Sequence, residues 1–143
     1  MSGSCPFCNI VSGKAPASVV YEDATVLAFM DLNPASIGHT LVIPREHWEN
    51  MYEIPEKALA EISPVIKRIC VAVKKAVGAD GISVLQLNGQ AAGQVVMHFH
   101  VHVIPRFSKG AISKGSVALI KSQGLKPDRG NLDEIAKRIQ EEL

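Results

Sequence analysis

The sequence lacks an excess of charge of either sign, because its 143 residues carry 15 Lys and Arg against 14 Asp and Glu, a formal net charge of +1. Proteins that bind long polyanions usually have a clear basic excess, so we expect no nucleic-acid partner. No apolar run reaches the length of a membrane span, and residues 1–6 lack the basic start and apolar segment of a secretory signal. We therefore expect a cytoplasmic protein without a membrane partner.

Cysteine is also scarce, and the three cysteines are an odd number that makes a poor disulfide framework. Cys5 and Cys8 lie close together, whereas Cys70 lies inside a helical pattern. We expect reduced thiols, with the Cys5 and Cys8 pair available to a metal. Hydrophobic residues make up 47% of the sequence, which is enough for the core of one domain of ordinary size.

Two helices are predicted. Apolar residues recur at spacings of three and four over residues 55–77, which indicates a long helix with one buried stripe. Pro64 either kinks this helix or separates two starts. Asn131 and Glu134 form a capping box for a final helix that ends near Leu143 and that we expect to be peripheral. The stripe consists of Leu59, Ile62, Ile66, Ile69, Val73 and Val77.

Short β-branched and aromatic segments between turn-favouring residues predict five strands, at 19–22, 25–31, 38–43, 82–87 and 96–104. Residues 107–130 show no periodicity. The predicted fold class is therefore α+β, a mainly antiparallel five-stranded sheet with a long helix and a C-terminal helix on one face.

The last predicted strand carries His98, His100 and His102 at every second position. Strand geometry places these imidazoles on one face, about 7 Å apart, and the intervening residues in the core. Histidine can act as a neutral nucleophile and as a proton donor near neutral pH, since its ordinary pKa is about 6.5. We interpret the face as a phosphate site, with a solvated strand or a metal site as the alternative. The expected core residues are Met97, Phe99, Val101 and Val103.

The loop from Asn88 to Val95 precedes these histidines and contains Gly89 and Gly93. Glycines let the backbone approach a ligand and turn its N–H groups toward an anion. A phosphate cradle and an ordinary connecting loop are both compatible with this composition.

Two motifs together resemble the signature of the histidine-triad (HIT) superfamily. One is Gly93-Gln94-x-Val96-x-His98-x-His100-x-His102 followed by Ile104-Pro105-Arg106. The other is Phe29-x-Asp31-x-Asn33-Pro34, followed by Gly38-His39-Thr40 and by His47. The resemblance implies the HIT fold in a single domain of residues 1–143, with a core at 5–106 and a C-terminal extension at 107–143.

The resemblance implies covalent catalysis by the middle histidine. His100 would attack the α-phosphorus of a nucleotide, and water would release the nucleoside monophosphate from a nucleotidyl-histidine intermediate. His102 would hold the phosphate, while His39 would orient and electrostatically support the nucleophilic ring.

Within the superfamily the chain resembles the Hint branch more than the Fhit branch. The expected substrates are purine nucleoside 5′-phosphoramidates or related conjugates, with dinucleoside polyphosphates as the alternative. Val95 stands where Hint phosphoramidases usually have a hydroxyl residue, so ester, anhydride and sulfate-linked nucleotides stay open. A nucleotide-binding module that serves a protein partner is a second class of function. The substrate contacts implied are Phe7, Ile10, Phe29, Asp31 (to the ribose hydroxyls), Leu32, Asn88 and Val95 (to the phosphate), Gly93, Gln94 and Val96.

The C-x-x-C pair allows two thiolates to share a tetrahedral metal that needs two further ligands. The resemblance implies a structural zinc bound by Cys5, Cys8, His47 and His98. A redox dithiol and two unrelated cysteines are the alternatives. The resemblance also implies a homodimer, joined through the long helix and a strand edge into a continuous sheet.

Overall fold

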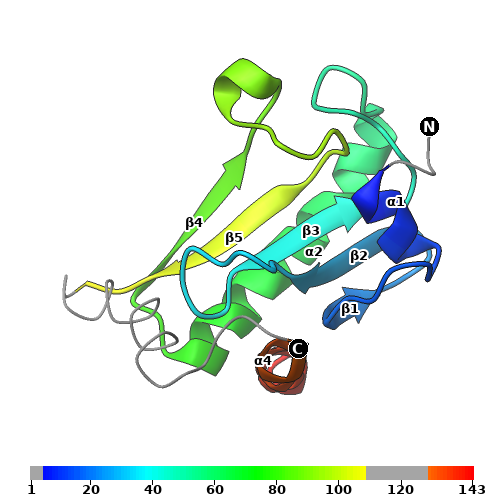
Figure 1. Cartoon of the computed structure of the whole chain (residues 1–143). Coiled ribbons are helices and arrows are strands. Elements are labelled where there is room, and N and C mark those ends of the chain that lie inside the picture. Colours follow the sequence, from blue (N-terminus) through cyan, green and yellow to red (C-terminus); the bar gives the residue numbers. More distant parts are fainter. Residues whose placement is uncertain (1–4, 109–128) are drawn as a thin grey trace.

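The computed structural model describes residues 5–108 and 129–143, and its centre is a five-stranded antiparallel sheet in the order β1-β2-β3-β5-β4 (Figure 1). Each strand pairs with its neighbours in antiparallel register. Within the described ranges, no helix combines the length and the apolar character that crossing a membrane requires. The strands are β1 (Val19–Glu22), β2 (Val26–Met30), β3 (Thr40–Pro44), β4 (Gly81–Gln86) and β5 (Val101–Arg106).

The predicted strand at 96–104 is wrong at its start, because β5 begins at Val101 and continues to Arg106. Pairing with both neighbours also begins at Val101. Just before it, the backbone N–H of Phe99 donates to the carbonyl of Trp48 at 2.7 Å and not to a strand. His98 and His100 therefore lie in the irregular approach to β5, where their rings are not restricted to one face of the sheet.

Helix α2 (Glu56–Val77) is continuous, so Pro64 neither divides it nor separates two starts. Pro64 and Ala60 are both exposed, so water can solvate the carbonyl that the missing proline N–H leaves without a donor. The helix ends at Gly78, which has a left-handed φ of 66° that favours glycine. The prediction that all six residues of the stripe are buried is right for half of them. Ile62, Ile69 and Val73 are buried, whereas Leu59, Ile66 and Val77 are only partly buried.

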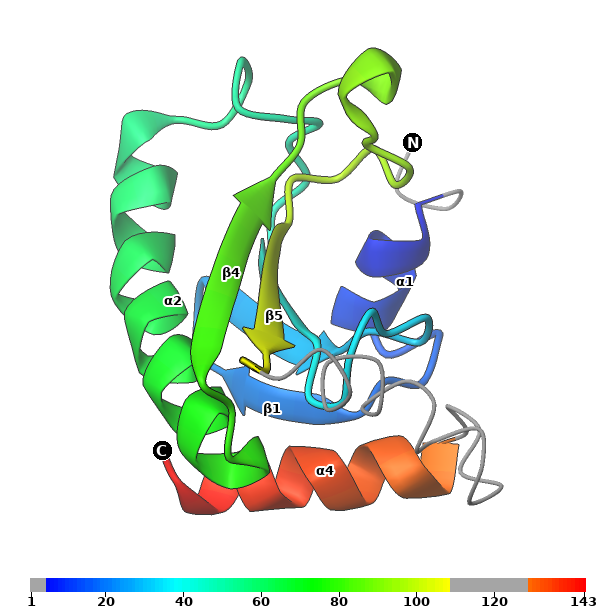
Figure 2. The ribbon, with the colours of Figure 1, turned by 90° about the vertical axis from the view of Figure 1, so that its left-hand side faces the viewer.

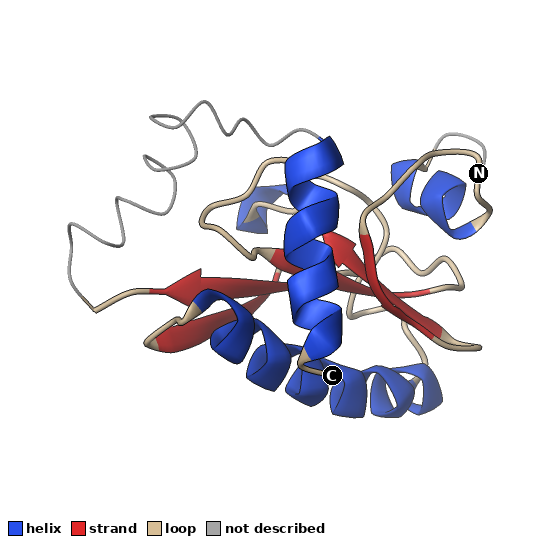
Figure 3. Cartoon of the chain, turned by 90° about the horizontal axis from the view of Figure 1, so that it is seen from below, coloured by secondary structure: helices blue, strands red, loops and turns tan. Residues whose placement is uncertain are grey.

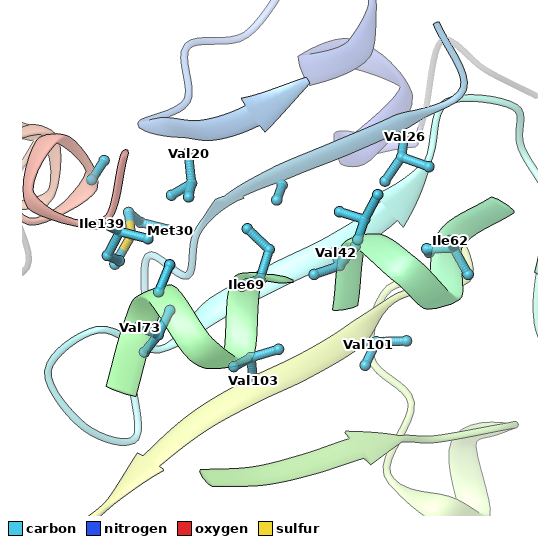
Figure 4. Close-up of a cluster of buried hydrophobic side chains, with 14 of the residues drawn as sticks. Val20, Val26, Met30, Val42, Ile62, Ile69, Val73, Val101, Val103 and Ile139 are labelled. Carbon is cyan, nitrogen blue, oxygen red and sulfur yellow. The ribbon is translucent and has the colours of Figure 1, made fainter. Parts of the chain in front are cut away.

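The main core lies between the sheet and α2, with alternate side chains of β2, β3 and β5 pointing into it (Figure 4). Phe99, Val101 and Val103 join this core as predicted, but Met97 is partly exposed because it precedes the strand. The labelled members are Val20, Val26, Met30, Val42, Ile62, Ile69, Val73, Val101, Val103 and Ile139.

Helix α4 (Arg129–Glu141) is not peripheral, since its residues Leu132, Ala136 and Ile139 are buried in the main core. It packs against α2 and against β1, the edge strand at one side of the sheet (Figures 2 and 3). The predicted capping box is also wrong, because the helix begins two residues before Asn131. The predicted irregular segment at 107–130 falls mostly outside the described residues.

Helix α1 (Pro6–Val11), which the sequence analysis did not predict, covers the opposite face of the sheet from α2 (Figure 2). Phe7 packs there with Phe29 and Leu41 in a second buried cluster. The helices are therefore not confined to one face. Because both faces are covered, every residue of β2 and β3 is buried.

Candidate active site

A row of side chains crosses the sheet on the α1 face. Phe29 on β2 lies opposite Leu41 on β3, and Leu41 lies opposite His102 on β5. His39 precedes β3 by one residue, and its carbonyl accepts a hydrogen bond from the backbone N–H of Asp31. Antiparallel register thus brings two segments that are about seventy residues apart in sequence to one site.

A cavity of about 380 Å³ opens above this row, within the size range of small-molecule sites. Most of its lining is apolar and comes from α1, the sheet and the adjoining loops, and the rest supplies imidazole, carboxylate and amide groups. The apolar lining comes from Pro6, Phe7, Ile10, Pro16, Ala17, Phe29, Met30, Leu32, Leu41, Leu87, Val95 and Val96, and the rest from Gly93, Asp31, Asn33, His100 and His102.

His100 is buried at the wall of this cavity, and its Nδ1 lies 2.7 Å from the carbonyl oxygen of His98. A carbonyl accepts only, so Nδ1 carries the ring proton and donates it. Burial lowers the pKa of His100 below its usual range, which keeps the ring neutral at neutral pH. Nε2 therefore holds the free lone pair and is the nucleophilic atom of the ring.

The backbone N–H of Ala35 determines which ring nitrogen of His39, and in turn of His102, carries the proton. The N–H of Ala35 donates to Nδ1 of His39 at 3.0 Å, so the proton of a neutral His39 sits on Nε2. Nε2 of His39 lies 3.0 Å from Nδ1 of His102 and donates to it. His102 must then carry its own proton on Nε2, where it can donate to a ligand in the cavity.

Burial lowers the pKa of His39 to about 4 and also lowers the pKa of His102, so both rings are neutral at neutral pH. The carboxylate of Asp31 opposes this shift but does not cancel it. Neutral rings are what the hydrogen-bond chain requires, since a protonated His39 could not accept from Ala35.

Asp31 contacts His39 and also lines the cavity. Its Oδ1 accepts the backbone N–H of Asn33 at 2.8 Å, and its Oδ2 lies 3.3 Å from Nε2 of His39. The side chain is 17% exposed and lines the cavity. One carboxylate oxygen thus shapes the turn after β2, while the other stays near both the histidine and the ligand space.

Most of the residues proposed to contact substrate line the cavity. The exceptions are Asn88 and Gln94, which are absent from the cavity lining. Asn88 exchanges two hydrogen bonds with Gln86 and accepts the N–H of Met51, and buried Gln94 bonds Gly89, Glu49 and Val96. Both side chains hold loop 87–100 against loop 45–55, two connections that lie side by side in Figure 1. Those in the lining are Phe7, Ile10, Phe29, Asp31, Leu32, Gly93, Val95 and Val96.

The hydrogen-bond partner of His39 in the triad is His102, and its interaction with His100 is electrostatic. The sequence analysis missed several lining residues, among them Leu41 and Leu87. Leu41 could have been found, since it follows His39 by two positions on a strand and so shares its face. Pro16, Ala17 and Leu87 sit in loops, whose positions no periodicity reports.

Cys5, Cys8, His47 and His98 form a second cluster, with all four ligand atoms within 4.8 Å of one another. Nδ1 of His98 lies 3.5 Å from Sγ of Cys5 and 3.6 Å from Sγ of Cys8, and Nδ1 of His47 lies 3.3 Å from Sγ of Cys8. Zinc bonds of about 2.3 Å to sulfur and 2.0 Å to nitrogen, at tetrahedral angles, would separate these atoms by about 3.6 Å. The four residues therefore fit zinc.

His98 is oriented for ligation. Its Nε2 donates to the carbonyl of Pro44 at 2.9 Å, which leaves the Nδ1 lone pair facing both sulfurs. Burial lowers the pKa of His98 to about 4, so the ring is neutral, as a metal ligand must be. A single lone pair cannot accept two straight S–H bonds, so a shared ion accounts for the arrangement better than thiol hydrogen bonds do.

The family model for the HIT domain matches residues 12–109 of the chain. The chain belongs to the HIT family. A HIT-like protein of Methanocaldococcus jannaschii is 42% identical over 135 residues, which cover 94% of this chain and 98% of that protein.

Two further HIT relatives have names that state an activity. An adenosine 5′-monophosphoramidase of Schizosaccharomyces pombe is 46% identical over 103 residues, which cover 72% of this chain and 74% of that protein. An adenylylsulfatase of Arabidopsis thaliana is 41% identical over 106 residues, or 74% of this chain. This chain spans only 54% of the length of the plant protein.

Solved HIT structures share the fold over nearly the whole chain. A HIT-like protein of Bartonella henselae has a TM-score of 0.86 at 35% identity, with 99% of this chain and 98% of that chain covered. A zinc-bound histidine-triad protein of Mycobacterium smegmatis has a TM-score of 0.82 at 34% identity, with 99% and 94% covered.

Proposed function

We propose that the protein hydrolyses a purine nucleoside 5′-phosphoramidate or a related nucleotide conjugate and releases the nucleoside monophosphate. Nε2 of His100 attacks the α-phosphorus, forms a P–N bond and displaces the leaving group with its electron pair. An amine leaving group takes up one proton as it departs. Water then attacks the same phosphorus and gives up one proton, and the P–Nε2 bond breaks with its electron pair returning to Nε2, which restores the neutral ring. Two displacements of this kind need no redox partner.

The observation that carries this proposal is the 2.7 Å bond from Nδ1 of His100 to the carbonyl of His98. It fixes the tautomer whose Nε2 lone pair lies at the cavity wall. It also stabilises the ring when Nε2 becomes bonded to phosphorus, because the positive charge then faces a carbonyl oxygen.

The apolar and polar lining of the cavity matches the parts of a nucleotide. The apolar space between α1 and the sheet accepts a base, stacked against Phe7 or Phe29, and Asp31 accepts the ribose hydroxyls. Nε2–H of His102 and backbone N–H groups near Val95 bind the phosphate oxygens. The side chains of Asn88 and Gln94 support the loop and do not contact the phosphate in this arrangement.

The leaving group lies beyond His102, next to Val95, whose side chain is 87% exposed. Relatives named for phosphoramidate and adenylyl sulfate cleavage share this fold, so both P–N and P–O–S bonds are candidates for the broken bond. Val95 cannot donate a side-chain proton, which favours leaving groups that depart without one.

Turnover and binding assays separate catalysis from binding. Adenosine 5′-phosphoramidate and adenylyl sulfate are incubated with the native protein and with His100→Asn, and AMP release is measured beside AMP affinity by calorimetry. The proposal expects the variant to lose at least about 10³-fold in kcat, as for removal of a nucleophile, with AMP binding retained. Negligible turnover of both substrates by both proteins, with AMP bound, would indicate a binding module.

We also propose that zinc, bound by Cys5, Cys8, His47 and His98, acts structurally. With four protein ligands there is no open position for substrate. The ion would link α1, the segment after β3 and the segment before β5, and would so hold the floor of the cavity beside His100.

The homodimer is proposed on the edge formed by β4 and α2. β4 is an edge strand, and Val84 on it is 48% exposed on the core side of the sheet. On α2, Leu59, Ile66 and Cys70 are partly buried beside the core. A second copy placed along this edge would cover this apolar strip and extend the sheet.

A further inference from the structure

The environment of His39 contains one proton and two acceptors. Because Nδ1 of His39 accepts from Ala35, the only proton of the neutral ring is on Nε2. Nδ1 of His102 lies 3.0 Å from that atom, and Oδ2 of Asp31 lies 3.3 Å from it. The hydrogen bond is the one to His102, and Oδ2 of Asp31 lies close enough to take the same N–H when the ring of His39 turns toward it.

The outcome of this competition decides the tautomer of His102. When the N–H of His39 points to His102, the proton of His102 must be on Nε2, where it can donate to a phosphate oxygen. When the ring of His39 rotates so that its N–H points to Asp31, Nδ1 of His102 loses its donor and can take the proton itself. Nε2 of His102 then presents a lone pair that repels the phosphate.

We propose that Asp31 couples sugar recognition to phosphate chemistry, so that a vicinal diol bound to its carboxylate releases the N–H of His39 to His102 and fixes the donor tautomer of His102. The inference rests on the proposed function for its ligand, a ribonucleotide. Asp31 acts here as a positioning residue through His39. Its Oδ1 stays with the N–H of Asn33, so the diol binds at Oδ2, the oxygen beside His39.

If this coupling exists, the ribose hydroxyls raise kcat in addition to lowering KM. For the native protein, a 2′,3′-dideoxy substrate with the same phosphoramidate should lower kcat by about three- to tenfold, the equivalent of one hydrogen bond, in addition to raising KM. If the hydroxyls only add binding, KM rises and kcat is unchanged.

Asp31→Asn gives the sharpest test, because it should restore the kcat that the native protein loses with the dideoxy substrate. The amide oxygen can keep the bond to Asn33, but the amide NH₂ cannot accept from His39, so the competition ends. With the dideoxy substrate, kcat of Asp31→Asn should exceed kcat of the native protein and come within about twofold of the native value with ribose. Asp23→Asn, at a similar turn between β1 and β2, is the matched control and should change nothing.

The tautomer of His102 can be observed without turnover by ¹⁵N NMR of the imidazoles. AMP should shift the native protein to a single Nε2–H form, 2′,3′-dideoxy-AMP should leave a mixture, and Asp31→Asn should show the single form with either nucleotide. One tautomer in all native samples, or a dideoxy kcat that falls further in Asp31→Asn, overturns the coupling. Failure of the proposed function is a separate result, since AMP would then still shift the tautomer although no substrate is turned over.

Discussion

Two histidines at the cavity have a tautomer fixed by one backbone group. The carbonyl of His98 fixes His100 and the N–H of Ala35 fixes His39, whereas the tautomer of His102 depends on the donation from His39. Burial lowers all three pKa values, so neutral rings with defined donors are the stable state at neutral pH. This state suits a nucleophile and a phosphate donor that must act without first losing a proton.

The depressed histidine pKa values predict a loss of stability in mild acid. In the unfolded chain His39 titrates near pH 6.5, whereas in the folded protein its pKa is about 4. Between these values the unfolded chain binds more protons, so the free energy of unfolding falls by up to about 1.4 kcal/mol per pH unit for this residue as pH decreases. Urea unfolding from pH 7 to pH 4.5 measures the slope. His39→Asn should give a shallower slope, and an identical slope would contradict the assignment.

Among the elements, α1 and α4 contribute to the cavity and to the core in ways that the sequence pattern does not predict. Helix α1 has six residues, which are too few for a periodic stripe. It nevertheless covers the face of the sheet opposite α2 and forms one wall of the cavity. α4 adds three buried apolar side chains to the main core. In contrast, the bounds of β1 and α2 follow the predicted ones to within a residue, since strong alternation or a long stripe defines them.

Removal of zinc should destabilise the α1 region without a direct effect on chemistry. A chelator should lower Tm and release about one zinc per chain, and Cys8→Ser should reproduce the lower Tm because a tetrahedral site loses one of its ligands. Cys70→Ser is the matched control, since Cys70 lies on α2 away from the cluster, and it should retain the zinc. A metal-free native protein with unchanged Tm would refute a structural zinc.

The contribution of α4 can be measured by truncating one buried side chain. Ile139 is fully buried, so Ile139→Ala should lower the free energy of unfolding by about 3 kcal/mol through lost burial and a residual cavity. Ile135→Ala is the matched control on the same helix, where the side chain is only partly buried, and should cost clearly less. Equal losses in urea unfolding would mean that α4 does not pack as described.

At the scale of the whole molecule, the sheet brings two distant motifs together. The turn after β2 and the approach to β5 are each recognisable as motifs in the sequence, and these motifs alone predict that both contribute to one site. The contact of His39 with His102 and the inward turn of Gln94 could not be predicted, because they depend on strand register and loop packing. The predicted start of β5 is wrong because alternation in the sequence continues through His98 and His100, whereas pairing with β3 and β4 begins only at Val101 and the N–H of Phe99 donates to Trp48.

The proposed dimer predicts that one exposed valine matters and another does not. Val84→Asp on β4 should shift the protein from dimer to monomer in sedimentation at micromolar concentration, because a carboxylate would be buried in an apolar interface. Val71→Asp is the matched control, since Val71 is 47% exposed but lies on the side of α2 near Tyr21, away from β4. A native protein that sediments as a monomer, or equal effects of both variants, would rule out this edge as the interface.

The most direct test of the account is the intact mass of the protein seconds after mixing with adenosine 5′-phosphoramidate, with a quench that avoids acid because the P–N bond of a phosphorylated histidine is acid-labile. The native protein should gain the mass of one adenylyl group, and the adduct should decay as AMP appears. His100→Asn should show no adduct. AMP release without any adduct, or an adduct that persists in His100→Asn, would contradict nucleophilic catalysis by His100.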